Sequence, residues 1–413
     1  MRRSRNLLVA ALAASLSVAA CRSRSDDEKA APTLQVTTVR DEAVTAPPAD
    51  ASSVASWPEL EELPRAEPVR VILVPARPDV PRFEVGGPVI DGDIAVVSSS
   101  QLGFAAVSWR RGTLLWTKPA GTRVAPPLVH DGRFVLIGAC LSPPEVPDDH
   151  LLLGCLRVVT PDGADQAYLA VHGKAKRVAA FAGAVGEQEV TATGEHTVRW
   201  RRGDAAVTVD LVRGIATPTP ATPTPVVVEH GGRRWEIVHD ETLVARSKGK
   251  IAWATEHEVT ALLGAVWLPE QSPMIRYANL SAHGDRPVIR LLDIDATGSM
   301  HGQAALTATP GIGLLGHAIS PVGDVALAIR LDRSIQRDYI AAYAANALLM
   351  WVYPLPQIPR ADPVGVAIAL DEDSAPEAVV VFHDGDTVTV LPSLSAPPTA
   401  PGAARAPLEK PTP

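Results

Sequence analysis

Several residue types are scarce in this 413-residue sequence, and each shortage excludes some classes of fold or function. Aromatic residues account for only 4% of the chain, whereas proline contributes 38 residues. Because proline lacks a backbone N–H and favours turns, this balance is typical of short strands joined by many turns rather than of long helices. Positive charge is also in deficit, since the formal net charge is −8 at pH 7. An acidic chain repels a phosphate backbone, so nucleic acid is not expected as a partner.

Local signatures of catalysis and of common metal sites are missing as well. There is no Gly-x-Ser-x-Gly nucleophile motif and no phosphate-binding loop that ends in Gly-Lys-Ser/Thr. The eleven histidines show no His-Glu-x-x-His spacing, and no Cys-x-x-Cys pair accompanies them, so a zinc site is not expected. We therefore predict no catalytic residue, no metal site and no cofactor, and the chain is not expected to be an enzyme.

Three local polar clusters can be explained without a catalytic or metal-binding role. The stretch DIDATG at 293–298 begins like a calcium loop, but its twelfth position is Ala304 where a bidentate Glu is required, so we interpret the aspartates as turn caps. The residues SAHGD at 281–285 lie too close along one strand or turn to converge as a triad. The acidic run LDEDSAPE at 370–377 is interpreted as a surface loop.

Cysteine is scarce, with three residues, and the first of them indicates where the protein is located in the cell. The opening MRRSRNLLVAALAASLSVAAC joins a basic start to an apolar stretch that is too short to span a bilayer, with small residues before Cys21. The segment VAAC resembles a bacterial lipobox, which implies cleavage before Cys21 and acylation of that residue. An ordinary signal peptide with a chance cysteine is the alternative. We expect a lipid anchor in the cell envelope, at the periplasmic side of the outer membrane of a Gram-negative bacterium or at the cell surface, because Arg22 replaces the aspartate that favours inner-membrane retention.

The other two cysteines flank a long predicted hairpin loop. Cys140 ends the strand-like GRFVLIGAC and Cys155 opens CLRVV. Facing residues of an antiparallel pair lie within disulfide range, and an exported compartment is oxidising, so we predict a Cys140–Cys155 disulfide. Two buried reduced thiols are the alternative.

Composition divides the chain into four parts. Residues 1–20 form the predicted signal peptide, and residues 21–65, rich in Ala, Pro, Ser and charge, form a predicted disordered tether. Within the tether, the β-branched residues of LQVTTV at 34–39 are suited to pairing as a strand. Residues 66–394 carry the β-rich pattern, and the Pro/Ala-rich residues 395–413 form a predicted disordered tail. Within the β-rich part, ATPTPATPTPV at 216–226 is expected to be an extended connection, because its prolines exclude an interior strand.

A phrase of about four dozen residues repeats through the β-rich part. The hexapeptides RGTLLW (111–116), KGKIAW (248–253) and NALLMW (346–351) share one frame. The glycine of this frame recurs every 40 to 51 residues, at Gly112, Gly163, Gly203, Gly249 and Gly298, with Ala347 in the last copy. Upstream, apolar runs flank tight-turn residues such as Asp-Gly, as in GGPVIDGDIAVVSS at 86–99. This spacing is in the range of propeller blades, each a four-stranded antiparallel sheet with no room for a crossover helix.

Three tryptophans share one place in this frame. We predict that Trp116, Trp253 and Trp351 occupy equivalent blade positions, where each large ring covers the gap to a neighbouring sheet. A ligand-stacking cage is the alternative, but it requires residues about 100 positions apart in different blades to converge.

These phrases resemble the repeat of quinoprotein-type propellers. The match rests on Gly112–Trp116, Gly249–Trp253 and the LDIDATG that contains Gly298, and it would cover about residues 66–394. It implies an all-β propeller of about seven blades, with six or eight as alternatives, closed by PVRVILVP (68–75) pairing with EAVVVFHDGDTVTVL (377–391). The quinone, calcium and catalytic aspartate of those enzymes do not map onto residues here, so the resemblance concerns the repeat alone.

The resemblance and the anchor together suggest a class of function. Propeller lipoproteins of the outer-membrane β-barrel assembly machinery are similar in anchor and repeat type, which implies a membrane-anchored, non-catalytic scaffold that binds a protein or other envelope partner. The 141–154 loop is the expected elaboration of its binding face. A quinone-dependent dehydrogenase-like or glycan-acting propeller enzyme is the alternative, and a purely structural envelope lipoprotein is a third possibility.

Overall fold

The computed structural model describes most of the β-rich part of the chain. The described residues are 37–39, 64–77, 79–80, 85–230, 232–255, 259–266, 273–283, 286–307, 313–332, 337–345, 348–356 and 364–394. Cys21, the predicted signal peptide at 1–20, nearly all of the predicted tether at 21–65 and the predicted tail at 395–413 lie outside them.

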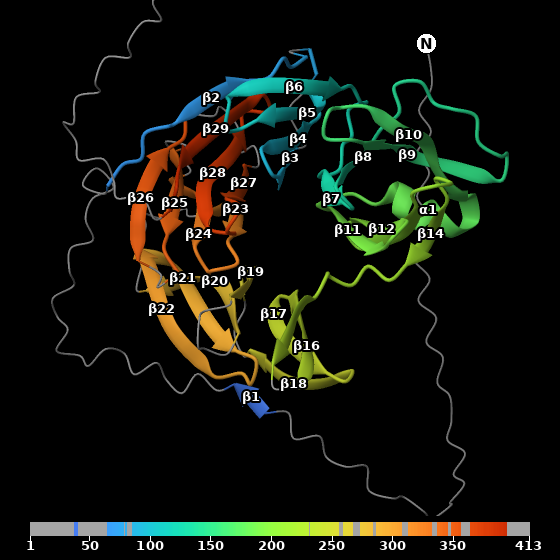
Figure 1. The fold of residues 1–413 in the computed structure, drawn as a ribbon. Coiled ribbons are helices and arrows are strands. Elements are labelled where there is room, and N and C mark those ends of the chain that lie inside the picture. The colour runs from blue at the N-terminus through green and yellow to red at the C-terminus, as the bar shows by residue number, and fades with distance from the viewer. Residues whose placement is uncertain are drawn as a thin grey trace, which may run out of the picture. The chain divides into compact units, whose positions relative to one another are not determined.

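Seven four-stranded antiparallel blades form a ring, so the predicted all-β propeller and its seven blades are confirmed (Figure 1). Blade 1 consists of β3 (Val85–Asp91), β4 (Ile94–Ser99), β5 (Gly103–Ser108) and β6 (Thr113–Lys118). Blade 2 consists of β7 (Leu128–His130), β8 (Arg133–Gly138), β9 (His150–Val159) and β10 (Asp165–Lys174), and blade 3 of β11 (Gln188–Gly194), β12 (Thr197–Arg202), β13 (Ala205–Asp210) and β14 (Ala216–Thr219).

The remaining blades follow in chain order. Blade 4 consists of β15 (Val226–His230), β16 (Arg233–Asp240), β17 (Thr242–Ser247) and β18 (Lys250–Thr255), and blade 5 of β19 (Ala261–Val266), β20 (Met274–His283), β21 (Arg286–Asp295) and β22 (Met300–Thr307). Blade 6 consists of β23 (Gly313–Ile319), β24 (Val325–Asp332), β25 (Arg337–Tyr343) and β26 (Leu349–Pro354). Blade 7 combines β27 (Gly365–Leu370), β28 (Pro376–His383) and β29 (Thr387–Pro392) with β2 (Arg70–Leu73). First strands of adjacent blades contact one another in the pairs β3–β7, β7–β11, β15–β19, β19–β23, β23–β27 and β27–β3, which places them around the axis.

Ring closure joins the two ends of the β-rich part, as the sequence predicted. β2 pairs antiparallel with β29, in a register that sets Arg70 opposite Val390 and Leu73 opposite Thr387. The strand thereby covers an edge of the C-terminal sheet that would otherwise be open to another chain. Farther upstream, the short β1 (Thr37–Val39) pairs in parallel with β18 as a fifth strand, inside the segment predicted to be a tether.

The repeated phrases map onto two kinds of turn. The upstream apolar phrases form hairpins of first and second strands, for example β3 with β4 and β23 with β24. Gly112 lies in the turn between third and fourth strands with φ of 73°, a conformation that glycine adopts without steric cost. Gly163, Gly249 and Gly298 lie in the same kind of turn, but Gly203 lies between a second and a third strand. Its place in blade 3 is taken by Gly214, whose N–H donates to Asp210 as that of Gly112 donates to Ser108.

Two local expectations need correction. Residues 216–219 of the Pro-rich segment form β14, the outermost strand of blade 3, and only the residues after it connect to blade 4. Pro218 is tolerated because an edge strand does not need every N–H. The described part of the chain also contains one short helix, α1 (Ala175–Gly183), between blades 2 and 3, where the repeat pattern left no room for one. Its Val178 and Phe181 pack into the core of those blades, and apolar burial explains its stability.

The core lies between blades rather than at the centre of the ring. The described residues form six buried apolar clusters, and each of them bridges two neighbouring blades. These clusters cover every seam except that between blades 3 and 4. A four-stranded sheet cannot bury its own apolar face, so each blade is stabilised mainly by its neighbours.

Candidate functional site

The three tryptophans of the repeat lie on fourth strands of three different blades. Trp116 is on β6, Trp253 on β18 and Trp351 on β26. Each indole N–H donates to a backbone carbonyl of the next blade: Trp116 to Pro161 at 3.1 Å, Trp253 to Ala296 at 2.9 Å and Trp351 to Ser393 at 3.4 Å. The three rings therefore sit at separate seams and do not converge on one ligand.

Close packing against the first of these rings explains a glycine of the repeat. At Gly163, an added Cβ would lie 2.6 Å from Cδ1 of Trp116, which is shorter than real contacts allow. Trp253 and Trp351 are buried, with exposed fractions of 2% and 1%, whereas Trp116 keeps part of its ring at the surface. The repeat-defining residues Gly112, Trp116, Gly249, Trp253, Gly298 and Trp351 thus have positions in turns and seams and are not gathered into a site.

The predicted disulfide is present at the base of the long loop of blade 2. Cys140 follows β8 and Cys155 lies on β9, and their Cα atoms are 5.1 Å apart. Since β8 and β9 already set Gly138 opposite Cys155, the bridge extends the hairpin by a covalent link. Residues 141–149 are therefore tied at one end by the disulfide and at the other by the start of β9.

A compact surface next to this loop has the features of a contact site. Leu141 and Tyr168 are exposed to 50% and 46%, and both lie around a small cavity of about 10 Å³ together with Cys155 and Arg157. We call Leu141, Arg157, Tyr168 and the disulfide the clamped-loop surface. Leucine and tyrosine side chains this exposed present apolar area that folding has left uncovered.

Ion pairs hold the polar part of the clamped-loop surface in place. The guanidinium of Arg157 lies 4.3 Å from the ring centroid of Tyr168 and donates to the Asp165 carboxylate at 3.0 Å. Lys118 of blade 1 contacts the same carboxylate at 3.1 Å. A cation over an aromatic face is attracted by the ring quadrupole, so Tyr168 is oriented before any partner arrives.

A second candidate is the cavity where the first strands meet. It has a volume of about 900 Å³ and is bounded by residues of β3, β23 and the segments before β7, β11, β19 and β27. Much of its wall is backbone and aliphatic side chains, with Glu187, Gln188, Thr260 and His317 as polar groups. A cavity of this size is in the range of small-molecule sites.

Its histidine is uncharged at neutral pH. Burial lowers the pKa of His317 below its usual value, and the nearby His239 lowers it further. The Nε2–H of His239 in turn donates to the carbonyl of Val259 at 2.6 Å. The cavity therefore offers the imidazole of His317 and the carboxylate of Glu187 rather than a cationic site.

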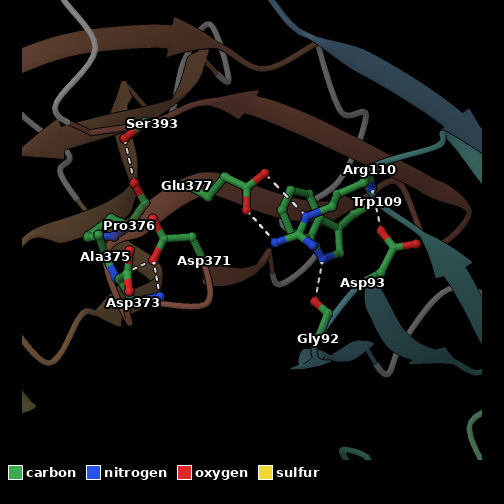
Figure 2. Close-up of polar contacts among 10 residues, drawn as sticks. All are labelled: Gly92, Asp93, Trp109, Arg110, Asp371, Asp373, Ala375, Pro376, Glu377 and Ser393. Atoms are coloured by element: carbon green, nitrogen blue, oxygen red, sulfur yellow. Dashed lines mark hydrogen bonds and ion pairs between the residues drawn. The ribbon is translucent and has the colours of Figure 1, made fainter.

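The acidic run at 370–377 is partly used in the seam between blades 7 and 1 (Figure 2). Glu377 accepts from Nε and Nη2 of Arg110 at 3.2 and 2.5 Å, and this hydrogen bonding is the main cause that raises the pKa of Arg110. Asp93 accepts from the backbone N–H of Arg110 at 3.1 Å, and Asp371 caps its own turn by accepting from the N–H groups of Asp373 and Ala375. These carboxylates have structural partners, so we assign them no chemistry.

The aspartates of DIDATG have structural partners, and the SAHGD stretch is only partly described. Asp295 caps its turn, with its Oδ1 accepting from the N–H groups of Thr297 and Ser299, whereas Asp293 forms an ion pair with the buried Arg276. Ser281 and His283 lie on β20, and Asp285 is outside the described residues. Within the described part of the chain, no group of three or more metal-ligating side chains is found, and no helix is long and apolar enough to cross a bilayer.

Sequence reasoning missed the side chains of the clamped-loop surface. It selected the loop and its two cysteines but not Arg157 or Tyr168, because alternation along a strand does not tell which face a neighbouring blade will cover. The available signal was a tyrosine opposite an arginine in the predicted β9–β10 hairpin.

Several solved structures resemble this fold at low identity. BamB from Moraxella catarrhalis is 12% identical with a TM-score of 0.39, and the match covers 79% of this chain and 99% of that one. The WD40 β-propeller domain of Doa1 is 11% identical with a TM-score of 0.41, covering 78% and 96%. BBS1N in complex with ARL6DN is 10% identical with a TM-score of 0.45, covering 80% and 99%. No protein-family model and no curated protein matches the sequence. Identities this low do not indicate a shared function.

Proposed function

We propose that this protein is a non-catalytic scaffold, anchored to a membrane of the exported compartment, whose clamped-loop surface binds a protein partner. The observation that carries the proposal is the exposed pair Leu141 and Tyr168, fixed beside Arg157 by a disulfide and two ion pairs. Tyrosine and arginine are the residues that most often dominate binding energy at protein interfaces.

Preorganisation supports a scaffold role for this surface. A partner that binds a flexible loop must order it, at a cost of about 0.5–1.5 kcal/mol for each immobilised side chain. Here Arg157 is already held by Asp165, and the loop is tied by the Cys140–Cys155 bond. Affinity would then come from burying Leu141 and Tyr168, with little ordering cost.

Membrane anchoring is proposed from the N-terminal sequence. The basic start, the short apolar stretch and VAAC before Arg22 support acylation of Cys21 and retention at the outer membrane. Replacement Cys21→Ser should move the protein from the membrane fraction to the soluble exported fraction and abolish labelling by a clickable palmitate analogue. Retention of both label and membrane fractionation in this variant would contradict the anchor.

Binding is tested by site-specific photocrosslinking in living cells. A photoreactive amino acid at Leu141 should yield a discrete crosslinked species, which mass spectrometry then identifies. The matched control is Val322, which is 40% exposed in a turn of blade 6 and should give no such species. Tyr168→Ala should reduce the Leu141 crosslink. Equal crosslinking from both positions, or none at Leu141, would argue against this surface.

The cavity where the first strands meet favours a second candidate function, as a quinone-dependent or glycan-acting propeller. Its volume of about 900 Å³ suits a quinone cofactor or a short oligosaccharide. Titration with pyrroloquinoline quinone and calcium, and separately with oligosaccharides, would show quenching of tryptophan fluorescence if the cavity binds them. The scaffold proposal expects no saturable change.

A further inference from the structure

Two histidine side chains face each other on adjacent strands of blade 2. His150 is the first residue of β9, and His172 lies near the end of β10. Their Nδ1 atoms are 2.7 Å apart, and the ring centroids are separated by 4.9 Å with planes inclined by 40°. The side chain of His150 is 16% exposed, so the pair is shielded by the sheet but reachable from solvent. Neither the repeat nor the clamped-loop surface uses this contact.

The contact requires that one nitrogen carry a hydrogen and the other a lone pair. The Oδ1 atom of Asp149 lies 3.8 Å from Nε2 of His150, which favours a hydrogen on that nitrogen and leaves the lone pair of His150 on Nδ1. His172 then donates its Nδ1–H. An imidazole binds a metal through a ring-nitrogen lone pair, and one such lone pair is already directed into the contact between the two rings.

We propose that His150 and His172 form a copper(II) site in which each ring turns from the hydrogen-bond line so that the two Nδ1 atoms become adjacent ligands, while the hydrogen on Nδ1 of His172 passes through solvent to its Nε2 and the ring stays neutral. Bonds of about 2.0 Å at a right angle place two nitrogens about 2.8 Å apart, whereas tetrahedral zinc needs about 3.3 Å. The observed 2.7 Å matches the square-planar arrangement. Copper(II) adopts that geometry and also stands highest in the divalent affinity order.

Water molecules occupy the remaining coordination positions of the copper ion. No third ligating side chain joins the pair among the described residues, so two water molecules complete the square plane. Asp149 acts as a positioning residue, because it lies on the far nitrogen of His150 and can orient that ring. The site does not rest on the proposed scaffold function, since the imidazole pair is separate from Leu141 and Tyr168.

The test is a copper(II) titration of the full chain, read by electron paramagnetic resonance and by competition with a chelator. We expect one tight equivalent with hyperfine coupling to two nitrogens. His150→Ala and His172→Ala should each weaken binding at least tenfold and remove the two-nitrogen pattern. Asp149→Asn should weaken it less than either alanine variant does, because Asp149 lies 3.8 Å from Nε2 of His150 and only orients that ring. His196→Ala is the matched control, since His196 is 64% exposed beside Glu195 and should bind as the wild type does.

Three results would overturn the proposal. They are unchanged copper binding in both His150→Ala and His172→Ala, a spectrum without coupling to two nitrogens, and zinc(II) binding as tight as copper(II). Circular dichroism of each variant checks the fold. If an alanine variant fails to fold, His150→Gln and His172→Gln keep the side-chain volume and carry the same expectation.

Discussion

The seam between blades 7 and 1 is mainly apolar, whereas the seam between blades 3 and 4 is mainly polar. At the first, Phe382, Val380 and Val97 belong to one fully buried apolar cluster that also includes Ile72 of β2. Polar links reinforce it, since Ser99 donates to the carbonyl of Gly385 at 2.8 Å and Arg110 pairs with Glu377. This seam joins residues almost three hundred positions apart in the chain.

At the second seam, the facing sheets are polar. In β12, Val198 and Trp200 are turned toward blade 2, which leaves Arg199 and Arg201 on the opposite face. In blade 4, Trp235 and Ile237 pack toward blade 5, so the other face carries residues such as Arg234, Glu236 and Arg246. Arg199 donates to the carbonyls of Pro220 and Thr222 in the connection between the two blades.

The two seams also differ in how the chain connects their blades. Blades 3 and 4 are joined by a few residues after β14, so they stay close even without apolar contact. In blade 7 only β2 is joined to blade 1 by a short segment, whereas β27–β29 reach blade 1 by folding, and the entropy of closing so long a loop must be offset by burial and pairing. We therefore expect stability to depend strongly on one seam and weakly on the other.

The largest expected effect comes from the apolar closure. Phe382→Ala removes a fully buried ring from the cluster between blades 7 and 1 and should lower the free energy of unfolding by about 3–5 kcal/mol. Urea denaturation followed by tryptophan fluorescence measures it. A loss below about 1 kcal/mol would mean that the closure seam is not decisive.

The disulfide closes a short loop within one blade, so its contribution to stability can be compared with that of ring closure. Cys140→Ser with Cys155→Ser opens a link across a sequence separation of 15 and should cost about 3 kcal/mol. The same denaturation assay applies, with reduced wild-type protein as the control. If the double variant unfolds like the oxidised wild type, the loop is held by its strands alone.

A smaller effect is expected from the polar link at the closure seam. Glu377→Gln removes the charge that Arg110 contacts, but both side chains are more than one third exposed, at 38% and 37%. Solvent screens such pairs, so the loss should be smaller than that of either preceding variant and should vanish in 1 M salt. A loss that persists at high salt would show that the seam needs the hydrogen bonds themselves.

The smallest effect is expected at the polar seam. Arg199→Ala should change the free energy of unfolding by no more than about 0.5 kcal/mol, because a partly exposed side chain leaves no cavity. Amide hydrogen exchange of Ala221, Thr222 and Thr224 should nevertheless become faster, since Arg199 contacts Pro220 and Thr222. A loss as large as that of Phe382→Ala would erase the contrast between the two seams.

The architecture was predictable because its signals are local. Turn residues between apolar runs, such as Asp91-Gly92, specify hairpins within a dozen residues, and their recurrence gives the blade count. The disulfide was predictable for the same reason, since Cys140 and Cys155 flank one hairpin. Where local copies differ, prediction failed: Gly203 follows RR as Gly112 does, yet it lies between the second and third strands of blade 3, and Gly214 lies in the turn between the third and fourth.

The sequence by itself determined the strands, their turns and the repeat that makes a ring of blades, because alternation and turn chemistry act over a few residues. Only the tertiary structure decided which faces are covered, and hence that Tyr168 is exposed over Arg157, that Glu377 reaches Arg110, and that two histidines 22 positions apart bring their Nδ1 atoms together. Such contacts depend on register and packing between strands, and neither quantity is contained in any short stretch of chain.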